Sequence, residues 1–149
     1  MSPKFKQFTS AVMDYPKFKA QFSSFCETII KNLNNNSQLP GFSFSVVCEG
    51  TAAEVLILDQ KFVVKFHLVV LNDERIGVLG AYLPTQGDEE ILLWQTFFDI
   101  HGNVKDTPDA SAIYNLQDNK FLDKLLGEFT DRYFSHLIET FKLTAPAQR

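Results

Sequence analysis

The side chains that could carry acid–base chemistry are few in this sequence, and they are scattered. The three histidines lie far apart, and the acids at positions 88–90 are neighbours in one polar stretch. A general base needs a partner held beside it, and a hydrolytic pair needs two carboxylates held apart across a groove. The spacing indicates neither arrangement, so we expect a non-enzymatic protein.

The two cysteines do not form a metal or redox motif. Cys26 falls among the apolar positions of an expected helix, and Cys48 shares the apolar side of an expected strand. Zinc sites and redox pairs need closely spaced ligands, which these residues lack. We therefore expect two small core residues and neither a metal nor another cofactor, while a disulfide between the two remains open.

One group of residues could line a small-ligand cavity. His67 lies in the apolar run 61–71 and would act as the polar anchor, and Trp94 is the one tryptophan of the chain. Aromatic rings with a single polar group are typical lining for a small-molecule site. The full set of candidates for ligand binding is His67, Tyr82, Trp94, Phe66, Leu68 and Phe98.

A second group could contact a partner. Lys17 and Lys19 belong to the first forty residues, which carry a local net charge of +3 on a chain whose total is −4. Gln95 and Asp99 are polar positions in an otherwise apolar strand, and they alternate with Trp94. If that side of the sheet is buried, they need partners there, which a subunit interface could supply.

Apolar residues at helical spacing predict helices at both ends of the chain. Phe5, Phe8 and Val12 predict a short first helix that ends before Pro16, and a second helix begins at Pro16 with apolar residues at three-to-four spacing. Residues 118–143 predict a long last helix with Asp118 as its N-cap.

Five strand-like runs fill the middle of the chain, at residues 42–49, 52–58, 61–71, 75–83 and 91–100. The connections between them are short and polar, as in hairpins, so a meander with the first run at its edge is the expected topology. Residues 1–149 then form a single α+β domain of two layers: N-terminal helices, a five-stranded antiparallel meander sheet, and a long C-terminal helix packed on the sheet.

The run 61–71 is apolar on both of its sides. Phe62, Phe66 and Val70 alternate with Val63 and Val69, and the fifth run is similarly apolar. One layer of helices can cover only one side of a sheet. The second side would be covered by a bent sheet folding over itself, by the N-terminal helices, or by another copy of the protein.

Composition narrows the class of partner. A net charge of −4 disfavours nucleic-acid binding through phosphates, and no apolar run approaches the roughly 20 residues that cross a bilayer. We expect a cytoplasmic protein with no membrane contact.

Two functions fit these patterns. The first is a small cytosolic protein-interaction module, working as a homodimer and with a possible further protein partner. The alternative is a small-ligand-binding protein or enzyme with an apolar cavity between a curved sheet and the C-terminal helix. In that alternative the order of the sheet and last helix is similar to helix-grip folds.

Overall fold

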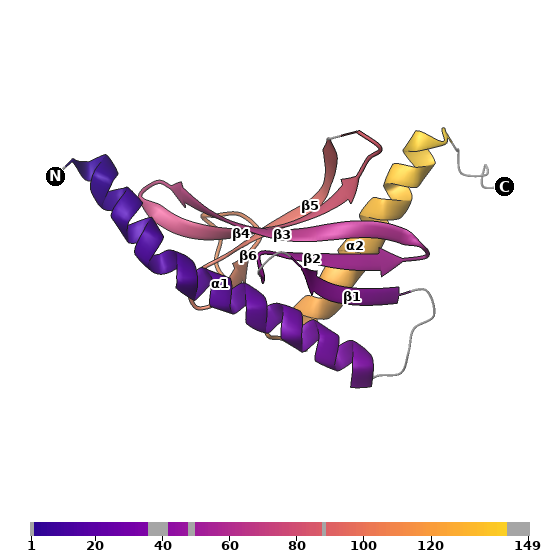
Figure 1. Cartoon of the computed structure of the whole chain (residues 1–149), viewed down its shortest axis with the longest axis horizontal. Helices are drawn as coiled ribbons and strands as arrows, with labels where there is room; N and C mark the ends of the chain where they lie inside the picture. Colours follow the sequence, from indigo (N-terminus) through magenta and orange to yellow (C-terminus); the bar gives the residue numbers. More distant parts are fainter. Residues whose placement is uncertain (1, 36–41, 48–49, 88, 143–149) are drawn as a thin grey trace.

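The computed structural model of the protein describes residues 2–35, 42–47, 50–87 and 89–142. It contains an α+β fold in which two helices pack against an antiparallel sheet (Figure 1). The elements, in chain order, are α1 (Pro3–Asn35), β1 (Phe42–Val47), β2 (Ala52–Ile57), β3 (Gln60–Leu71), β4 (Glu74–Pro84), β5 (Glu90–Phe98), β6 (Asn103–Lys105), β7 (Tyr114–Asn115) and α2 (Asn119–Thr140).

The sheet is a meander with strand order β1-β2-β3-β4-β5-β6-β7. The five expected strands and the edge position of β1 are confirmed, but the described residues form two more strands. β6 and β7 contain only three and two residues, too short to give an alternating pattern. Two-residue turns link β2 to β3 and β3 to β4, and their central residues, such as Leu58 (φ 51°) and Asp59 (φ 65°), have the positive φ typical of hairpins.

A single helix replaces the two that the sequence predicts at the N-terminus. α1 runs without interruption from Pro3 to Asn35 and includes Pro16 (Figure 1). Proline cannot donate the helical hydrogen bond, which is why the sequence favours a break there. Tertiary contacts beside Pro16 oppose the break, since Asp14 accepts a 2.5 Å bond from Arg75 and Tyr15 stacks on Phe66.

Both helices pack on the same face of the sheet. On β3, Phe66 contacts Phe22 of α1, and Phe62 meets Phe129 of α2 edge to face with ring centroids 4.6 Å apart. Residues 62 and 66 point to the same side of a strand. The two helices also touch each other, through Phe25 and Phe121. This face is therefore the core, built largely from phenylalanine.

α2 begins where the sequence predicts, but Asp118 does not cap it as expected. The Asp118 carboxylate makes no capping bond to the first turn and instead accepts a 3.0 Å hydrogen bond from the backbone N–H of Asn115. The side chain is thus used to hold the preceding turn. The buried residues of α2, from Phe121 to Tyr133, pack its first four turns against the sheet.

The second face of the sheet carries no helix among the described residues. On this side of β3, His67, Val69 and Leu71 are exposed, Val69 to 39% and Leu71 to 44%. The expectation that both sides of this strand are buried from solvent is therefore wrong for the single chain. The sequence allows three ways of covering the second face of the sheet. The N-terminal helix is excluded as that cover because α1 packs on the first face.

Candidate interaction surface

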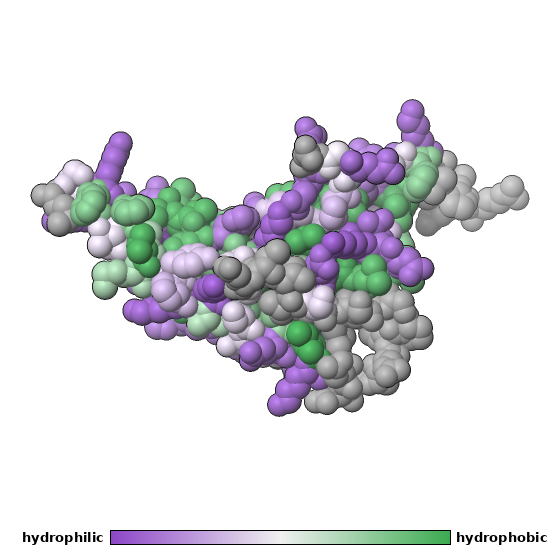
Figure 2. All heavy atoms as spheres, in the orientation of Figure 1, coloured by the Kyte–Doolittle hydropathy of each residue, from purple (hydrophilic) through white to green (hydrophobic). Residues whose placement is uncertain are grey.

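The first half of α1 extends beyond the packed core and exposes apolar side chains. Phe8 is 64% exposed and Met13 is 70% exposed, and Phe5 and Val12 are also exposed. Figure 2 shows hydrophobic residues gathered at this end of the molecule, over the first half of α1 and the neighbouring β3–β4 hairpin. Contiguous apolar patches on soluble proteins mark interaction sites. We call the exposed first half of α1, together with the adjacent edge of β3 at residues 67–71, the candidate surface.

The strand beside this half-helix has an unpaired edge. β3 contains 12 residues and β2 only six, so the β2 ladder ends where Ala52 faces Lys65. The N–H of Phe66 still donates to the carbonyl of Thr51, at 3.0 Å. In the described part of the chain, residues 67–71 pair with β4 alone. The other edge of this five-residue stretch is open.

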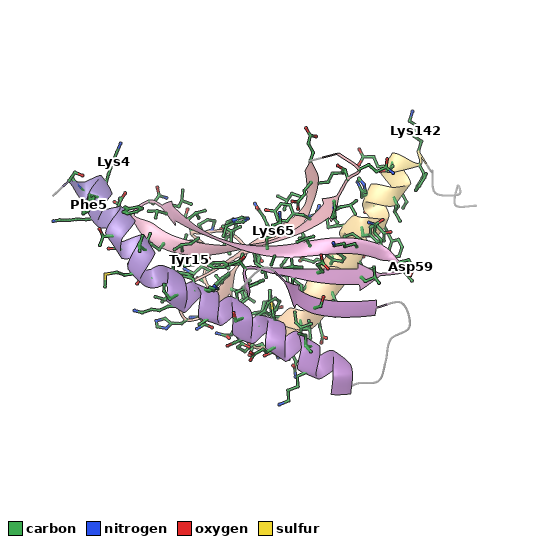
Figure 3. All side chains as sticks on the ribbon, viewed as in Figure 1. Lys4, Phe5, Tyr15, Asp59, Lys65 and Lys142 are labelled. Carbon is green, nitrogen blue, oxygen red and sulfur yellow. The ribbon has the colours of Figure 1, made fainter. Side chains whose placement is uncertain are left out.

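An open groove lies between this strand edge and α1. Its volume is about 660 Å³, and its lining includes Phe8, Val12 and Tyr15 of α1 and Phe66, His67 and Leu68 of β3. Figure 3 shows Tyr15 on the side of α1 that faces the sheet. We refer to this feature as the edge groove. Because its walls are mainly apolar and its floor adjoins a free strand edge, it suits an extended or helical protein segment.

Two polar contacts hold α1 over the β3–β4 hairpin. Gln7 donates a hydrogen bond to Asp73 in the hairpin turn, and Arg75 of β4 pairs with Asp14 of α1 at 2.5 Å. The Asp14 side chain is only 17% exposed, so this ion pair is better shielded than a surface pair. The exposed half of α1 is therefore fixed relative to the strand edge.

The central part of the second sheet face is polar. Lys65 pairs with Glu90 at 2.5 Å, and its ammonium also lies 5.3 Å from the centre of the Tyr82 ring. The Tyr82 ring covers Gly80, where a methyl group would lie 2.8 Å from it. Lys61 similarly pairs with Glu54. These ion pairs place charged groups on the second face of β2, β3 and β5.

The structure brings together only some of the residues proposed to bind a ligand. Phe66 and Phe98 are in contact in the core, with ring centroids 5.7 Å apart. Phe66, His67 and Leu68 line the edge groove. Trp94 lies further along the core face and donates a hydrogen bond to Glu128 of α2. Tyr82 lies on the opposite face, under Lys65.

The space between the sheet and α2 is nearly filled. Its volume is about 20 Å³, and its walls include Val64, Trp94 and Phe129. A cavity of that size holds roughly one water molecule, whereas small-molecule sites measure about 300–1,000 Å³. The packing in this region therefore does not favour the alternative of an apolar ligand cavity.

The residues proposed to contact a partner are dispersed. Lys17 is exposed beside Asp14, and Lys19 is half-buried near the turn at Gly50. Gln95 is exposed on the second face, whereas Asp99 accepts hydrogen bonds from the backbone N–H groups of His101 and Asn103. Asp99 thus shapes the turn between β5 and β6. None of these four residues lines the edge groove.

Cys26 is a free, buried thiol on the core side of α1. Burial, with a smaller contribution from the charge of Glu27, raises the pKa of this thiol to about 12. It is therefore protonated at neutral pH and behaves as an apolar core residue. The expectations for Cys48 and Asp88 concern side chains outside the described residues.

Sequence reasoning found parts of the candidate surface but not the whole. The spacing of Phe5, Phe8 and Val12 predicts one apolar stripe, but such a stripe on a helix is typical of a buried face. The apolar run 61–71 predicts interior positions for Val69 and Val70 in a central strand. The signal available in the sequence was the difference in length between the second and third strand runs, which leaves one end of the longer strand unpaired.

Comparisons of the chain with protein-family models, with curated proteins and with solved structures gave no match. Neither described helix is long and apolar enough to cross a lipid bilayer. Within the described residues, no three histidine, cysteine or acidic side chains gather as a metal site would require.

Proposed function

We propose that this protein is a cytoplasmic interaction module that acts as a homodimer through the candidate surface. The observation that supports this most is the exposure of Phe8, Val12 and Met13 on a half-helix fixed beside an open strand edge. Leaving these side chains in water costs free energy that a protein partner would recover, at about 25 cal/mol per Å² of apolar area buried.

The lysines around the candidate surface act on partner choice and association rate more than on affinity. α1 carries five lysines against Asp14 and Glu27, and Asp14 is already paired with Arg75. Rim charges of this kind act on the rate of encounter, and because a second copy presents the same lysines, they oppose homodimer formation most at low ionic strength. Another protein with an acidic and apolar segment is the competing occupant of the same surface.

Light scattering after size-exclusion chromatography tests the proposal. We expect the unmodified chain to elute at twice its mass of 17.0 kDa. The double variant Phe8→Ser/Met13→Ser removes exposed apolar surface without touching the core, so it should elute as a folded monomer.

The matched control is Phe134→Ser/Ile138→Ser. These residues are two exposed apolar side chains one turn apart on α2, at 46% and 49% exposure. The control should remain dimeric if the candidate surface carries the interaction. Dissociation of the control together with a dimeric Phe8→Ser/Met13→Ser variant would place the interface on α2, and a monomeric unmodified chain would exclude the homodimer.

A further inference from the structure

We propose that two copies of the chain pair antiparallel through the open edge of β3, residues 67–71, about a two-fold axis at Val69. This inference depends on the homodimer proposed above and specifies its contact. The pairing would join two seven-stranded sheets into one continuous sheet. The partner that fits this edge is therefore the same edge of a second copy.

The backbone geometry of β3 selects the residues that can pair. The Phe66 N–H points toward β2, where it donates to Thr51. Backbone groups alternate between the two edges of a strand, so those of Leu68 and Val70 point the same way, beyond the end of β2. In a pair centred on Val69, Leu68 exchanges two hydrogen bonds with the partner's Val70. By symmetry Val70 exchanges two hydrogen bonds with the partner's Leu68, so about four backbone hydrogen bonds would join the two strands.

The register about Val69 uses the whole open edge and no more. It aligns His67 with the partner's Leu71 and Val69 with the partner's Val69. A shift of the axis toward Leu68 would drive the partner's strand against Ala52, which already occupies the edge beside Lys65. In the chosen register no two like charges face each other, and such pairs would be destabilising.

The first half of α1 adds to the same contact. A two-fold axis perpendicular to the sheet places both copies of α1 on one face, because it reverses the strands and keeps the faces. The exposed apolar residues of α1 and the hairpin offer on the order of 700 Å² per copy, from their exposed fractions and roughly 200 Å² per large side chain, divided between the face that carries α1 and the second face, on which Val69 and Leu71 lie; they are Phe5, Phe8, Val12, Met13, Val69, Val70 and Leu71. A stable interface needs about 800 Å² per partner, part of which is backbone and polar.

Another long open edge of the sheet is less suited to this pairing. β1 is the outer strand at that end, and α1 contacts it. α1 also lies along β3, so this contact does not distinguish the two edges; the difference is the group of exposed apolar residues beside the β3 edge. The edge at β7 is only two residues long. The outer edge of β5 has a longer stretch without a ladder partner, residues 90–96, and it adjoins the exposed Ile91 and Leu92, so pairing through β5 is the competing geometry. The stretch of β3 differs from it in lying beside the exposed apolar half of α1.

A charge swap at the symmetric position tests the inference. Val69 is partly exposed in the single chain, so Val69→Lys and Val69→Glu should both fold. In the dimer each would face its own copy across a pair whose Cα atoms are about 4.5 Å apart. We expect each variant alone to dissociate with a Kd raised about tenfold or more, and an equal mixture of the two to re-form a dimer.

Cysteine cross-linking tests the register, in a Cys48→Ser background and with that background as the control. Val69→Cys should form a disulfide between copies under mild oxidation, because a Cα separation of about 4.5 Å suits the bond. Leu71→Cys alone should not, since the two copies of residue 71 would be about 13 Å apart along the strands. A mixture of Leu71→Cys with His67→Cys should cross-link.

The outcomes separate this inference from the proposed function. If the unmodified chain is a dimer, but Val69→Lys remains dimeric and Val69→Cys does not cross-link, the β3 pairing is wrong and the homodimer stands on another surface. If the unmodified chain is monomeric, both are wrong. Dissociation of both charge variants with rescue on mixing supports the pairing, because only a self-facing position behaves in that way.

Discussion

The ring of Phe98 lies directly over Gly77, so that a methyl group at position 77 would sit 2.4 Å from the Phe98 Cζ atom. Phe98 is fully buried and also contacts Phe18 and Phe66. The absence of a side chain at Gly77 therefore leaves the space that the Phe98 ring occupies in the aromatic core between α1 and the sheet. Gly77 lies next to the hairpin that carries the candidate surface.

This contact predicts that Gly77→Ala destabilises the fold. The buried ring cannot move away without disturbing its neighbours, and overpacking of this kind costs about 1–3 kcal/mol. Gly127→Ala is the matched control, since nothing beyond the adjoining residues and backbone of α2 itself lies within 4 Å of its new methyl group. Alanine should gain about 0.5–1 kcal/mol there. Urea denaturation of both variants checks the pair, and a neutral Gly77→Ala would contradict the packing described.

The two halves of α1 should respond differently to the same change. Phe22 is completely buried, and Phe22→Ala should lower the free energy of unfolding by about 3–5 kcal/mol. Phe8→Ala should change the stability of the monomer by less than about 0.5 kcal/mol, because Phe8 is mostly exposed. Phe8→Ala should nevertheless weaken the dimer. Equal losses of stability in the two variants would mean that the first half of α1 is part of the core.

Proline at position 16 should lower the free energy of unfolding relative to alanine at the same position. It is exposed and inside α1, and it leaves the Val12 carbonyl without its usual helical donor. We expect Pro16→Ala to raise the free energy of unfolding by about 1–3 kcal/mol, measured by chemical denaturation. A loss of stability instead would mean that α1 needs a proline bend to reach Phe66 with Tyr15.

The Cys26 thiol predicts a specific loss of stability in alkali. Its pKa is about 12 in the folded protein against 9.0 ordinarily, so the folded state holds the proton more tightly than the unfolded chain. The contribution is complete below pH 9 and declines as pH rises toward about 12, by roughly 1.4 kcal/mol per pH unit. The difference in unfolding free energy between the unmodified chain and Cys26→Ala should shrink over that range. A difference independent of pH would show that the thiol is accessible.

The fold was largely predictable because local patterns agree with it. Alternation and two-residue turns specify the hairpins from β2 to β4, and the apolar stripe from Phe121 to Tyr133 specifies α2. The continuity of α1 through Pro16 was not predictable, since it depends on Asp14 and Tyr15 meeting residues of the sheet. Contacts between distant segments overrode a local signal.

The candidate surface was less accessible to sequence reasoning for a similar reason. The sequence predicts His67, Phe66 and Leu68 as site residues, and all three line the edge groove. The role of Phe8 and Val12 depends on where α1 runs relative to the end of β2, which periodicity does not specify. Trp94 and Tyr82 were grouped with His67, but alternation and the strand register place Tyr82 and Trp94 on opposite faces.

Sedimentation equilibrium of the full chain tests the central claim most directly. We predict a mass near twice 17.0 kDa at about 50 µM, with dissociation on dilution. A mass of 17.0 kDa throughout a range up to that concentration would contradict the account, because the exposed apolar half of α1 and the open edge of β3 would then have no second copy to cover them.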